Sequence, residues 1–420
     1  MEGHCFFYLI FKNKCYFCAN FKLNFKFAQI IYNMVINRTI ADEMVRLSRV
    51  FPVVVLTGPR QSGKTTLCRS LFADYYYANL ENITMRNMIA DNPLGFINQH
   101  RGGLIVDEAQ RMPEILSYIQ VVVDEVGESR IVVTGSSNFA LLEGVTQSLA
   151  GRAAVLTLLP LSLAELQGAT NYDTDSLMLR GGYPAVWGKD MSPEDVYSNY
   201  YTTYIERDLR QIINIKDLSL FQRCVALLAG SVGMEFNASK LSAEIGVSSN
   251  TIQQWFSVLE ASYIVYRLPP YFRNIGKRLL KTPKLYFYDV GLACYLLGIN
   301  DTKQLSVHPL RGHIFENYVV SEMIKRYFNR GKTPRLFFFR DSHQKEVDIV
   351  EEYAFRELHA YEIKSSQRYS STFASGLTYF KKLFGEEVRS STVVYDGTEE
   401  VTGGEIEYVS YRTFLCKAPK

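Results

Sequence analysis

The feature that most constrains this chain is a glycine-containing loop between an apolar run and a helical pattern. Residues 53–57 read Val-Val-Val-Leu-Thr, and residues 58–65 follow with the spacing Gly-x-x-x-x-Gly-Lys-Thr. An apolar, β-branched run predicts a buried strand, and apolar residues at helical spacing come after the loop. A strand, this loop and a helix, in that order, make up a P-loop. The sequence therefore predicts a site for the phosphates of a nucleoside triphosphate.

The residue types of the loop account for this expectation. Gly58 and Gly63 have no Cβ, so backbone N–H groups can curl round a phosphate. Lys64 is expected to reach the β- and γ-phosphates, and the Thr65 hydroxyl is expected to ligate Mg²⁺. The predicted nucleotide-binding residues are Gly58, Pro59, Arg60, Gln61, Ser62, Gly63, Lys64, Thr65 and Thr66. The expected cofactors are ATP and Mg²⁺.

A second apolar run ends in two carboxylates. Residues 104–108 read Leu-Ile-Val-Asp-Glu, which predicts a Walker B strand. Asp107 is expected to hold Mg²⁺ through water, and Glu108 is expected to orient or activate the attacking water. A solvated strand end is the plainer interpretation of such a pair, but the P-loop before it favours the magnesium site. A glutamate beside the aspartate also favours ATP hydrolysis over phosphorylation of a small molecule.

Two further positions are candidates for contact with the γ-phosphate. Residues 130–137 form another predicted parallel strand that ends in hydroxyls, so Ser136 or Ser137 could sense the phosphate or cap the next helix. Arg152 precedes a predicted strand at 154–158, and it could act as an arginine finger or lie on the surface. The predicted catalytic residues of the ATPase are Lys64, Glu108, Ser136 and Arg152.

Several motifs together resemble a prokaryotic family of AAA-like P-loop ATPases. The motifs of the first part are Gly-Pro-Arg-Gln-x-Gly-Lys-Thr-Thr-Leu from residue 58, Asp-Glu-Ala-Gln from 107, Thr-Gly-Ser-Ser from 134 and Leu-Ala-Gly-Arg from 149. Further motifs are Pro-Leu-Ser from residue 160, Gly-Gly-Tyr-Pro from 181, Tyr-Ile-Glu-Arg-Asp from 204 and Lys-Leu-Tyr-Phe-Tyr-Asp-Val-Gly-Leu from 284. The resemblance covers residues 34 to about 410. It implies an ATPase fold followed by a C-terminal domain of unknown function.

Residues 1–33 differ in composition from the rest of the chain. They are rich in Phe, Tyr, Asn and Lys and hold three of the seven cysteines. Lysines interrupt the apolar run that a signal peptide would need. We expect a non-native or disordered extension, with Met34 as the natural start.

Composition limits the class of protein. No apolar run is long enough to cross a membrane, so no membrane span is expected. Scattered cysteines suit a reducing cytoplasm, and the lone Cys15–Cys18 spacing gives only weak support to zinc or redox chemistry. The net charge of +3 is close to neutral, so a nucleic-acid partner has to be inferred from local patches.

The middle of the chain predicts helices and a DNA-binding module. Residues 171–215 indicate a helical lid or linker, and residues 237–260 have the pattern of a helix-turn-helix within a winged-helix domain at 216–303. Side chains at the start of its second helix can contact bases or phosphates. The residues expected to face DNA there are Ser249, Asn250, Gln253 and Gln254.

A run without acidic residues follows this helix and predicts a basic wing that contacts DNA. Its basic residues are Arg267, Arg273, Lys277, Arg278, Lys281 and Lys284. DNA is therefore the expected partner. A winged helix that only packs against protein is the alternative.

Two alternating segments near the C-terminus predict a metal-dependent site. Glu362 and Lys364 share one face of a strand, because side chains two residues apart point the same way. Asp348 is expected on the adjacent antiparallel strand. Two carboxylates and a lysine can hold Mg²⁺, position a water and offset the charge of a phosphodiester.

These residues resemble the PD-(D/E)xK nuclease superfamily. The match departs from the pattern at Val347, which stands in place of the proline. Glu316, on an amphipathic helix, would add a ligand. A degenerate fold used only for docking is the alternative. Over the whole chain, the predicted metal ligands are Thr65, Asp107, Glu316, Asp348 and Glu362, and the predicted nuclease residues are Asp348, Glu362 and Lys364.

The sequence thus predicts an α/β protein with a P-loop parallel-sheet ATPase core at 34–170, a lid or linker at 171–215, a winged helix at 216–303 and an α/β PD-(D/E)xK-like domain at 304–420. The expected function is that of a cytoplasmic ATP-binding and ATP-hydrolysing AAA-like ATPase that acts on DNA, with metal-dependent nuclease activity as a further expectation. The alternative is an ATP-controlled DNA- or protein-binding switch whose nuclease-like domain is inactive. The sequence allows a homo-oligomer.

Overall fold

The computed structural model describes residues 36–136, 144–145, 147–166, 171–188, 191–209, 217–272 and 282–416. The predicted extension at 1–33 lies outside the described residues.

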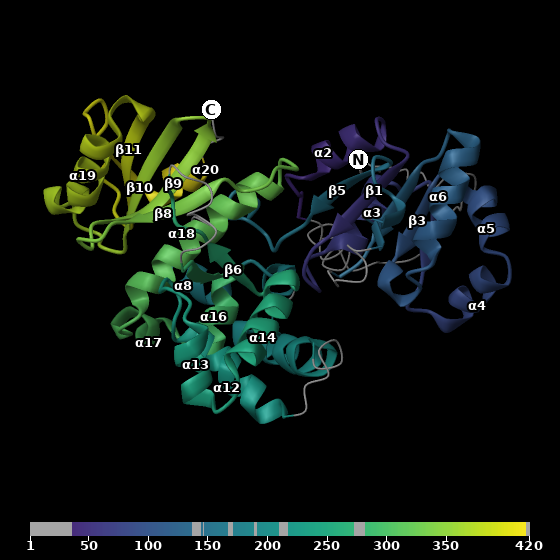
Figure 1. Cartoon of the computed structure of the whole chain (residues 1–420), viewed down its shortest axis with the longest axis horizontal. Coiled ribbons are helices and arrows are strands. Elements are labelled where there is room, and N and C mark those ends of the chain that lie inside the picture. Colours follow the sequence, from purple (N-terminus) through teal and green to yellow (C-terminus); the bar gives the residue numbers. More distant parts are fainter. Residues whose placement is uncertain are drawn as a thin grey trace, which may run out of the picture. The chain divides into compact units, whose positions relative to one another are not determined.

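A parallel five-stranded sheet forms the first part, with the strand order β2-β3-β4-β1-β5 (Figure 1). The strands are β1 (Val53–Thr57), β2 (Tyr76–Asn79), β3 (Leu104–Asp107), β4 (Ile131–Thr134) and β5 (Ala153–Thr157). All neighbouring strands pair in parallel. β1, β3 and β4 are buried along their whole length, which explains their continuous apolar sequences. The predicted α/β class with a parallel P-loop sheet is confirmed.

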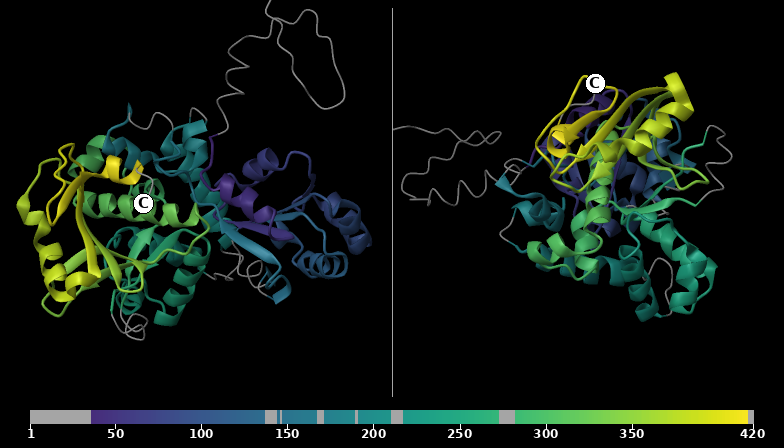
Figure 2. Two further views of the ribbon diagram at one scale, coloured as in Figure 1. Left: turned by 90° about the horizontal axis from the view of Figure 1, so that it is seen from above. Right: turned by 90° about the vertical axis from the view of Figure 1, so that its left-hand side faces the viewer.

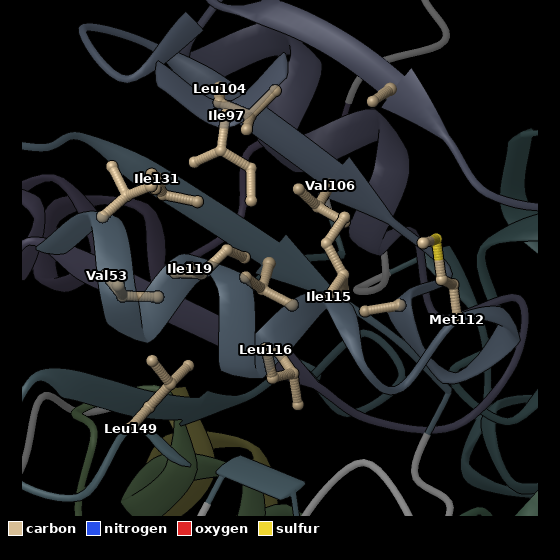
Figure 3. Close-up of a cluster of buried hydrophobic side chains, with 14 of the residues drawn as sticks. Val53, Ile97, Leu104, Val106, Met112, Ile115, Leu116, Ile119, Ile131 and Leu149 are labelled. Atoms are coloured by element: carbon tan, nitrogen blue, oxygen red, sulfur yellow. The ribbon is translucent and has the colours of Figure 1, made fainter. Parts of the chain in front are cut away.

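Helices cover both faces of this sheet. They are α2 (Ala41–Ser48), α3 (Lys64–Leu71), α4 (Ile83–Asp91), α5 (Pro93–His100) and α6 (Ile115–Val126), with a short 3₁₀ turn, η1 (Ala109–Arg111), after β3. Successive strand residues point to opposite faces. Val53 and Val55 of β1 therefore share one core with Ile119 of α6 (Figure 3). Val54 and Leu56 belong to a second core, built with α2 and α3.

Helices dominate the middle of the chain. They are α8 (Thr174–Arg180), α9 (Pro184–Gly188), α10 (Pro193–Tyr200), the π-helix η3 (Tyr201–Leu209), α12 (Leu218–Ala229), α13 (Ala238–Ile245), α14 (Ser249–Ala261), α16 (Val290–Leu296) and α17 (Thr302–Val307). A tight turn joins α13 to α14, because Gly246 takes a φ of 86° and Ser248 caps α14. Strands β6 (Val265–Leu268) and β7 (Lys284–Phe287) then pair antiparallel. Whether these elements act as a winged helix stays a prediction.

A second, mixed sheet lies toward the C-terminus, where Figure 2 draws the chain in green to yellow. Its strand order is β12-β11-β10-β9-β8. Its strands are β8 (Leu336–Arg340), β9 (Glu346–Ala354), β10 (Glu357–Lys364), β11 (Val388–Tyr395) and β12 (Glu407–Ser410). The accompanying helices are α18 (Arg311–Phe328), η4 (Ser371–Ala374), α19 (Ser375–Phe384), η5 (Gly385–Glu387) and α20 (Tyr411–Cys416). β9 pairs antiparallel with both β8 and β10, whereas β11 pairs in parallel with both β10 and β12. Leu377 and Phe380 of α19 pack in the core of this sheet. None of the helices that the structure describes is long and apolar enough to cross a membrane.

Gly58, where the P-loop leaves β1, is the position at which glycine is needed most. Its φ is 138°, and a Cβ there would lie 2.2 Å from the carbonyl oxygen of Leu158. We predict that Gly58→Ala lowers the free energy of unfolding by about 1–3 kcal/mol, because it adds backbone strain and a backbone clash. Urea denaturation measures this loss. Gly102→Ala is the control, since a Cβ there meets nothing within 4 Å; equal losses in both variants would contradict the prediction.

Candidate functional site

The P-loop follows β1 directly and ends where α3 begins. Gln61 and Gly63 take φ values of 61° and 95°, so the chain reverses sharply before Lys64 starts the helix. Ser62 is a buried residue of this loop, and its carbonyl oxygen accepts a hydrogen bond of 2.8 Å from Arg38. The loop is therefore fixed from behind by a side chain that precedes the whole sheet.

Arg38 and Glu165 form a buried ion pair behind the P-loop. Arg38 Nε lies 3.2 Å from Glu165 Oε1, and a second guanidinium nitrogen donates to the Leu159 carbonyl at 2.6 Å. Glu165 also accepts hydrogen bonds from the backbone of Thr39 and Ser162. Burial lowers the pKa of Arg38, while the neighbouring carboxylate acts in the opposite direction. A buried charge pair held by this many hydrogen bonds stiffens the loop that it contacts.

Lys64 points into the loop that precedes it. Its Nζ donates to the carbonyl oxygens of Gly58 at 3.0 Å and Pro59 at 2.8 Å. Burial lowers the pKa of Lys64 to about 8, although Glu108 and Asp107 act to raise it. The ammonium therefore sits in a poorly solvated position where an anionic phosphate would stabilise its charge.

Asp107 collects hydrogen bonds from three elements at one edge of the sheet. Thr65 Oγ1 donates to Asp107 Oδ2 at 2.9 Å, and the Tyr77 hydroxyl donates to the same oxygen at 2.6 Å. The Thr134 hydroxyl donates to Oδ1. Because β3 and β4 are parallel neighbours, Asp107 and Thr134 end their strands at the same edge of the sheet, while the Tyr77 hydroxyl reaches Asp107 from the second residue of β2. The two predicted magnesium ligands of the ATPase part, Thr65 and Asp107, are thus in direct contact.

Glu108 and Ser136 are joined through Gln110. Glu108 takes a φ of 58°, so the chain turns away from β3 at this residue. Gln110 Nε2 donates to Ser136 Oγ at 2.9 Å and also to Glu108 Oε2. The structure therefore brings Ser136 into the polar group at the strand ends, as the sequence predicted. Ser137 lies outside the described residues.

Arg152 lies elsewhere. Its guanidinium pairs with Asp124 at 2.5 Å and donates to the Ala150 carbonyl at 3.1 Å. This pairing holds Arg152 against the end of α6 rather than against the P-loop. The plainer sequence interpretation, a surface arginine, describes its position in this structure, and a finger role stays a prediction.

Asp348, Glu362 and Lys364 converge on the mixed sheet. Lys364 Nζ lies 2.6 Å from Glu362 Oε1 and 4.0 Å from Asp348 Oδ2. The Ile363 amide donates to Asp348 at 2.7 Å, which fixes that carboxylate against β10. Burial and the nearby charge of Glu316 raise the pKa of Asp348. Burial and the nearby charge of Asp348 raise the pKa of Glu362. Like charges are thus held close together, and Glu362 Oε2 is buried without a hydrogen-bond partner.

Glu316 does not complete this group as predicted. Its Oε1 accepts hydrogen bonds from Lys284 Nζ at 3.0 Å and the Tyr286 hydroxyl at 2.5 Å. Within the described part of the chain, no three His, Cys, Asp or Glu side chains are arranged to hold a metal ion. Asp348 and Glu362 have the ligand chemistry for Mg²⁺, but Glu316 is committed to other partners.

The burial of Lys284 contradicts its predicted place in a DNA-contacting basic wing. This lysine is buried, with 4% of its surface exposed, so it cannot be part of a DNA-contacting surface. Arg267 also contacts other side chains of the protein: it pairs with Glu260 at 3.1 Å and lies over the ring of Phe256. The assignment of Lys284 to a DNA-contacting surface was wrong, since it pairs with acids that the local basic run does not reveal. DNA contact by Arg267, whose side chain is 31% exposed, stays a prediction. The other predicted wing residues lie outside the described residues: Arg273, Lys277, Arg278 and Lys281.

The helix α14 keeps three predicted DNA-facing residues at the surface. Asn250 and Gln253 are exposed, and so is Gln254. Ser249 is half-buried and shares a hydrogen bond of 3.1 Å with Ser242. The start of α14 therefore presents amide side chains rather than a row of cations.

Three family models match the sequence: AAA domain over residues 50–167, domain of unknown function DUF8612 over 171–303 and domain of unknown function DUF4143 over 311–414. An uncharacterized protein of Mycobacterium tuberculosis (strain ATCC 25618 / H37Rv) is 31% identical over 351 residues, which are 82% of this chain and 78% of that relative. The chain belongs to this family of prokaryotic AAA ATPases. The predicted resemblance is thereby confirmed.

Two further proteins are similar to this chain. An uncharacterized protein of Haemophilus influenzae (strain ATCC 51907 / DSM 11121 / KW20 / Rd) is 25% identical, with 90% of this chain and 98% of that relative covered. Among solved structures, a Walker-type ATPase of Pyrococcus abyssi is similar at 14% identity and a TM-score of 0.39, over 62% of this chain and 96% of that chain. A TM-score this low supports no argument about function.

Several residues of the AAA ATPase site were missed in the sequence. Thr134 ends β4 beside β3, and its strand-end position was the signal that could have found it. Tyr77 is the second residue of β2, so strand-end position gives no signal for it. Arg38 and Glu165 had no such signal, because they are far apart in the chain and belong to no motif. Lys284, outside this site, was noticed in the sequence but was predicted to be exposed, whereas it is buried.

The lowered pKa of Lys64 gives a pH prediction. Phosphates raise the lysine pKa on binding, so binding must take up a proton once the free protein has lost it above pH 8. We predict that ATP affinity falls by up to about tenfold per pH unit above pH 8. Calorimetry in two buffers of different ionisation enthalpy should detect the proton uptake. Unchanged affinity between pH 7 and pH 9.5 would contradict the prediction, and Lys64→Arg, which stays charged, should show no uptake.

Proposed function

We propose that this AAA ATPase hydrolyses ATP at the C-terminal edge of its parallel sheet and acts on DNA. The observation that carries the ATPase proposal is the hydrogen bond of 2.9 Å between Thr65 and Asp107. These are the hydroxyl and carboxylate that a P-loop enzyme uses for magnesium. Bound Mg²⁺ supplies charge neutralisation at the β- and γ-phosphates, and Thr65 and Asp107 would hold it.

The other side chains have complementary roles in this proposal. Lys64 stabilises the negative charge of the phosphates, and its buried position strengthens that attraction. Glu108 accepts a proton from the attacking water or orients that water. Gln110 fixes the Glu108 carboxylate and the Ser136 hydroxyl relative to each other, so it acts as a positioning residue.

Lys64→Ala tests the ATPase proposal. We predict that ATP turnover falls at least about 100-fold, because the variant removes a preorganised charge from the phosphate site, while the fold survives. Phosphate release measures turnover, and circular dichroism with thermal unfolding checks the fold. Lys303→Ala, an exposed lysine of α17, should keep the wild-type rate. An unchanged rate in Lys64→Ala would refute the proposal.

The DNA part of the proposal has two supports. The turn between α13 and α14 and the following hairpin β6–β7 have the element order of a winged helix. Asn250 and Gln253 are exposed at the start of α14, and amide side chains can bind base edges or phosphates. The competing proposal is a switch that binds protein through the same helix.

A second candidate function is cleavage of DNA at the mixed sheet. It is favoured by the position of Lys364 Nζ, which lies within 4.0 Å of a carboxylate oxygen of both Asp348 and Glu362. Asp348 and Glu362 would hold a divalent ion, and such an ion supplies a Lewis acid for phosphodiester hydrolysis. Lys364 would offset the charge on the scissile phosphate.

Asp348→Asn tests this second function. The asparagine keeps an oxygen that can accept the Ile363 amide hydrogen bond, so the sheet should survive. We predict that wild-type protein nicks plasmid DNA with Mg²⁺ or Mn²⁺ and that the variant loses at least about 100-fold of that activity, because one metal-binding charge is gone. Gel assays of supercoiled plasmid measure the rate.

The same protein samples separate the alternatives. Fluorescence anisotropy with a labelled duplex should show binding that weakens as salt rises, in both wild type and Asp348→Asn. Cleavage that persists in the variant would point to a contaminating nuclease. Salt-sensitive binding without any cleavage would support the DNA-binding switch, and absence of binding would favour a protein partner.

A further inference from the structure

Lys284 approaches the nuclease-like group, which consists of Asp348, Glu362 and Lys364, from outside the mixed sheet. It begins β7, which pairs with β6 in the hairpin that follows the helix-turn-helix. Its side chain is only 5% exposed. Its Nζ lies 3.0 Å from Glu316 Oε1 on α18 and 2.5 Å from Glu346 Oε1 on β9.

The surroundings of Lys284 are built to hold a positive charge. Tyr286, two residues further along β7, donates to the same oxygen of Glu316. The ring of Phe338 lies 5.6 Å from the ammonium. A buried lysine is costly unless it is paired and hydrogen-bonded, and here two carboxylates contact it directly. Because the ammonium is enclosed, it cannot reach a DNA phosphate.

The acidic side chains near the mixed sheet are consequently divided into two pairs. Lys284 binds Glu316 and Glu346, whereas Lys364 lies beside Asp348 and Glu362. His313 Nδ1 lies 3.8 Å from the second oxygen of Glu316, which is too far for a hydrogen bond. Arg340 takes the remaining oxygen of Glu346 at 2.9 Å. Asp348 and Glu362 are therefore left without a third carboxylate.

We propose that the Lys284 ammonium takes the place of a divalent cation at Glu316, and that it weakens the binding of a metal ion by the nuclease-like group in the resting protein. The inference rests on the proposed nuclease-like site, but it concerns metal occupancy and not cleavage. It also gives β7 a second role. This strand carries the lysine that occupies Glu316 of α18, so Glu316 is not available as a metal ligand beside Asp348 and Glu362.

The experiment counts Mn²⁺ ions bound to the full-length chain. All samples carry Asp107→Asn, so that the ATPase site does not contribute. Electron paramagnetic resonance of free Mn²⁺ during titration gives occupancy and affinity without any DNA. The test variant is Lys284→Met, and the matched control is Lys345→Met, an exposed lysine next to Glu346.

Lys284→Met should bind one Mn²⁺ at least tenfold more tightly than the parent protein, and adding Asp348→Asn should abolish that gain. Lys345→Met should behave as the parent. Lys284→Gln, which keeps a hydrogen-bond donor for Glu316, should show the same gain and covers the case in which the methionine variant does not fold. Tight Mn²⁺ binding by the parent that Asp348→Asn removes would overturn the proposal, and so would Lys284 variants that fold but gain no site. Failure of the nuclease proposal alone would leave these Mn²⁺ counts unchanged while no sample cleaved DNA.

Discussion

The candidate ATPase site depends on the hydrogen bonds that Asp107 accepts. Three elements place a hydroxyl on this one carboxylate: the start of α3, the second residue of β2 and the end of β4. Parallel pairing makes this possible, because neighbouring strands of one direction end at the same edge. The side chains that donate hydrogen bonds to the carboxylate are neutral hydroxyls, which leaves its negative charge available to an incoming positive ion. Through Thr65, this arrangement ties the end of the P-loop to the Walker B strand.

Sequence reasoning succeeded where the chemistry is contiguous and failed where it depends on distant partners. The spacing from Gly58 to Thr65 fixes a loop by itself, and alternation at Glu362 and Lys364 fixes a shared face. Lys284 looked like one basic residue in a basic run. Its burial depends on Glu316 and Glu346, which follow much later in the chain, and no local pattern shows that they will enclose it. The buried pair of Arg38 and Glu165 escaped prediction for the same reason.

The family signatures divide into reactive and structural groups. Asp289, from the motif that begins at Lys284, accepts hydrogen bonds from the Gly182 amide and the Tyr197 hydroxyl, both at 2.7 Å. A Cβ on Gly181, which has a φ of 58°, would lie 2.1 Å from that hydroxyl. The Gly-Gly-Tyr-Pro motif is thus explained by close packing on a buried aspartate. A recurring motif in this family does not by itself mark a reactive group.

The pairing of Arg38 with the back of the P-loop has a consequence for dissecting the molecule. The span that matches the AAA domain begins at residue 50, downstream of this arginine. A fragment cut at that boundary would retain every nucleotide-binding motif, yet it would leave the Ser62 carbonyl and the Glu165 carboxylate without their guanidinium. An isolated ATPase fragment intended for biochemistry should accordingly start upstream of Arg38, or its behaviour will report on a loosened phosphate cradle.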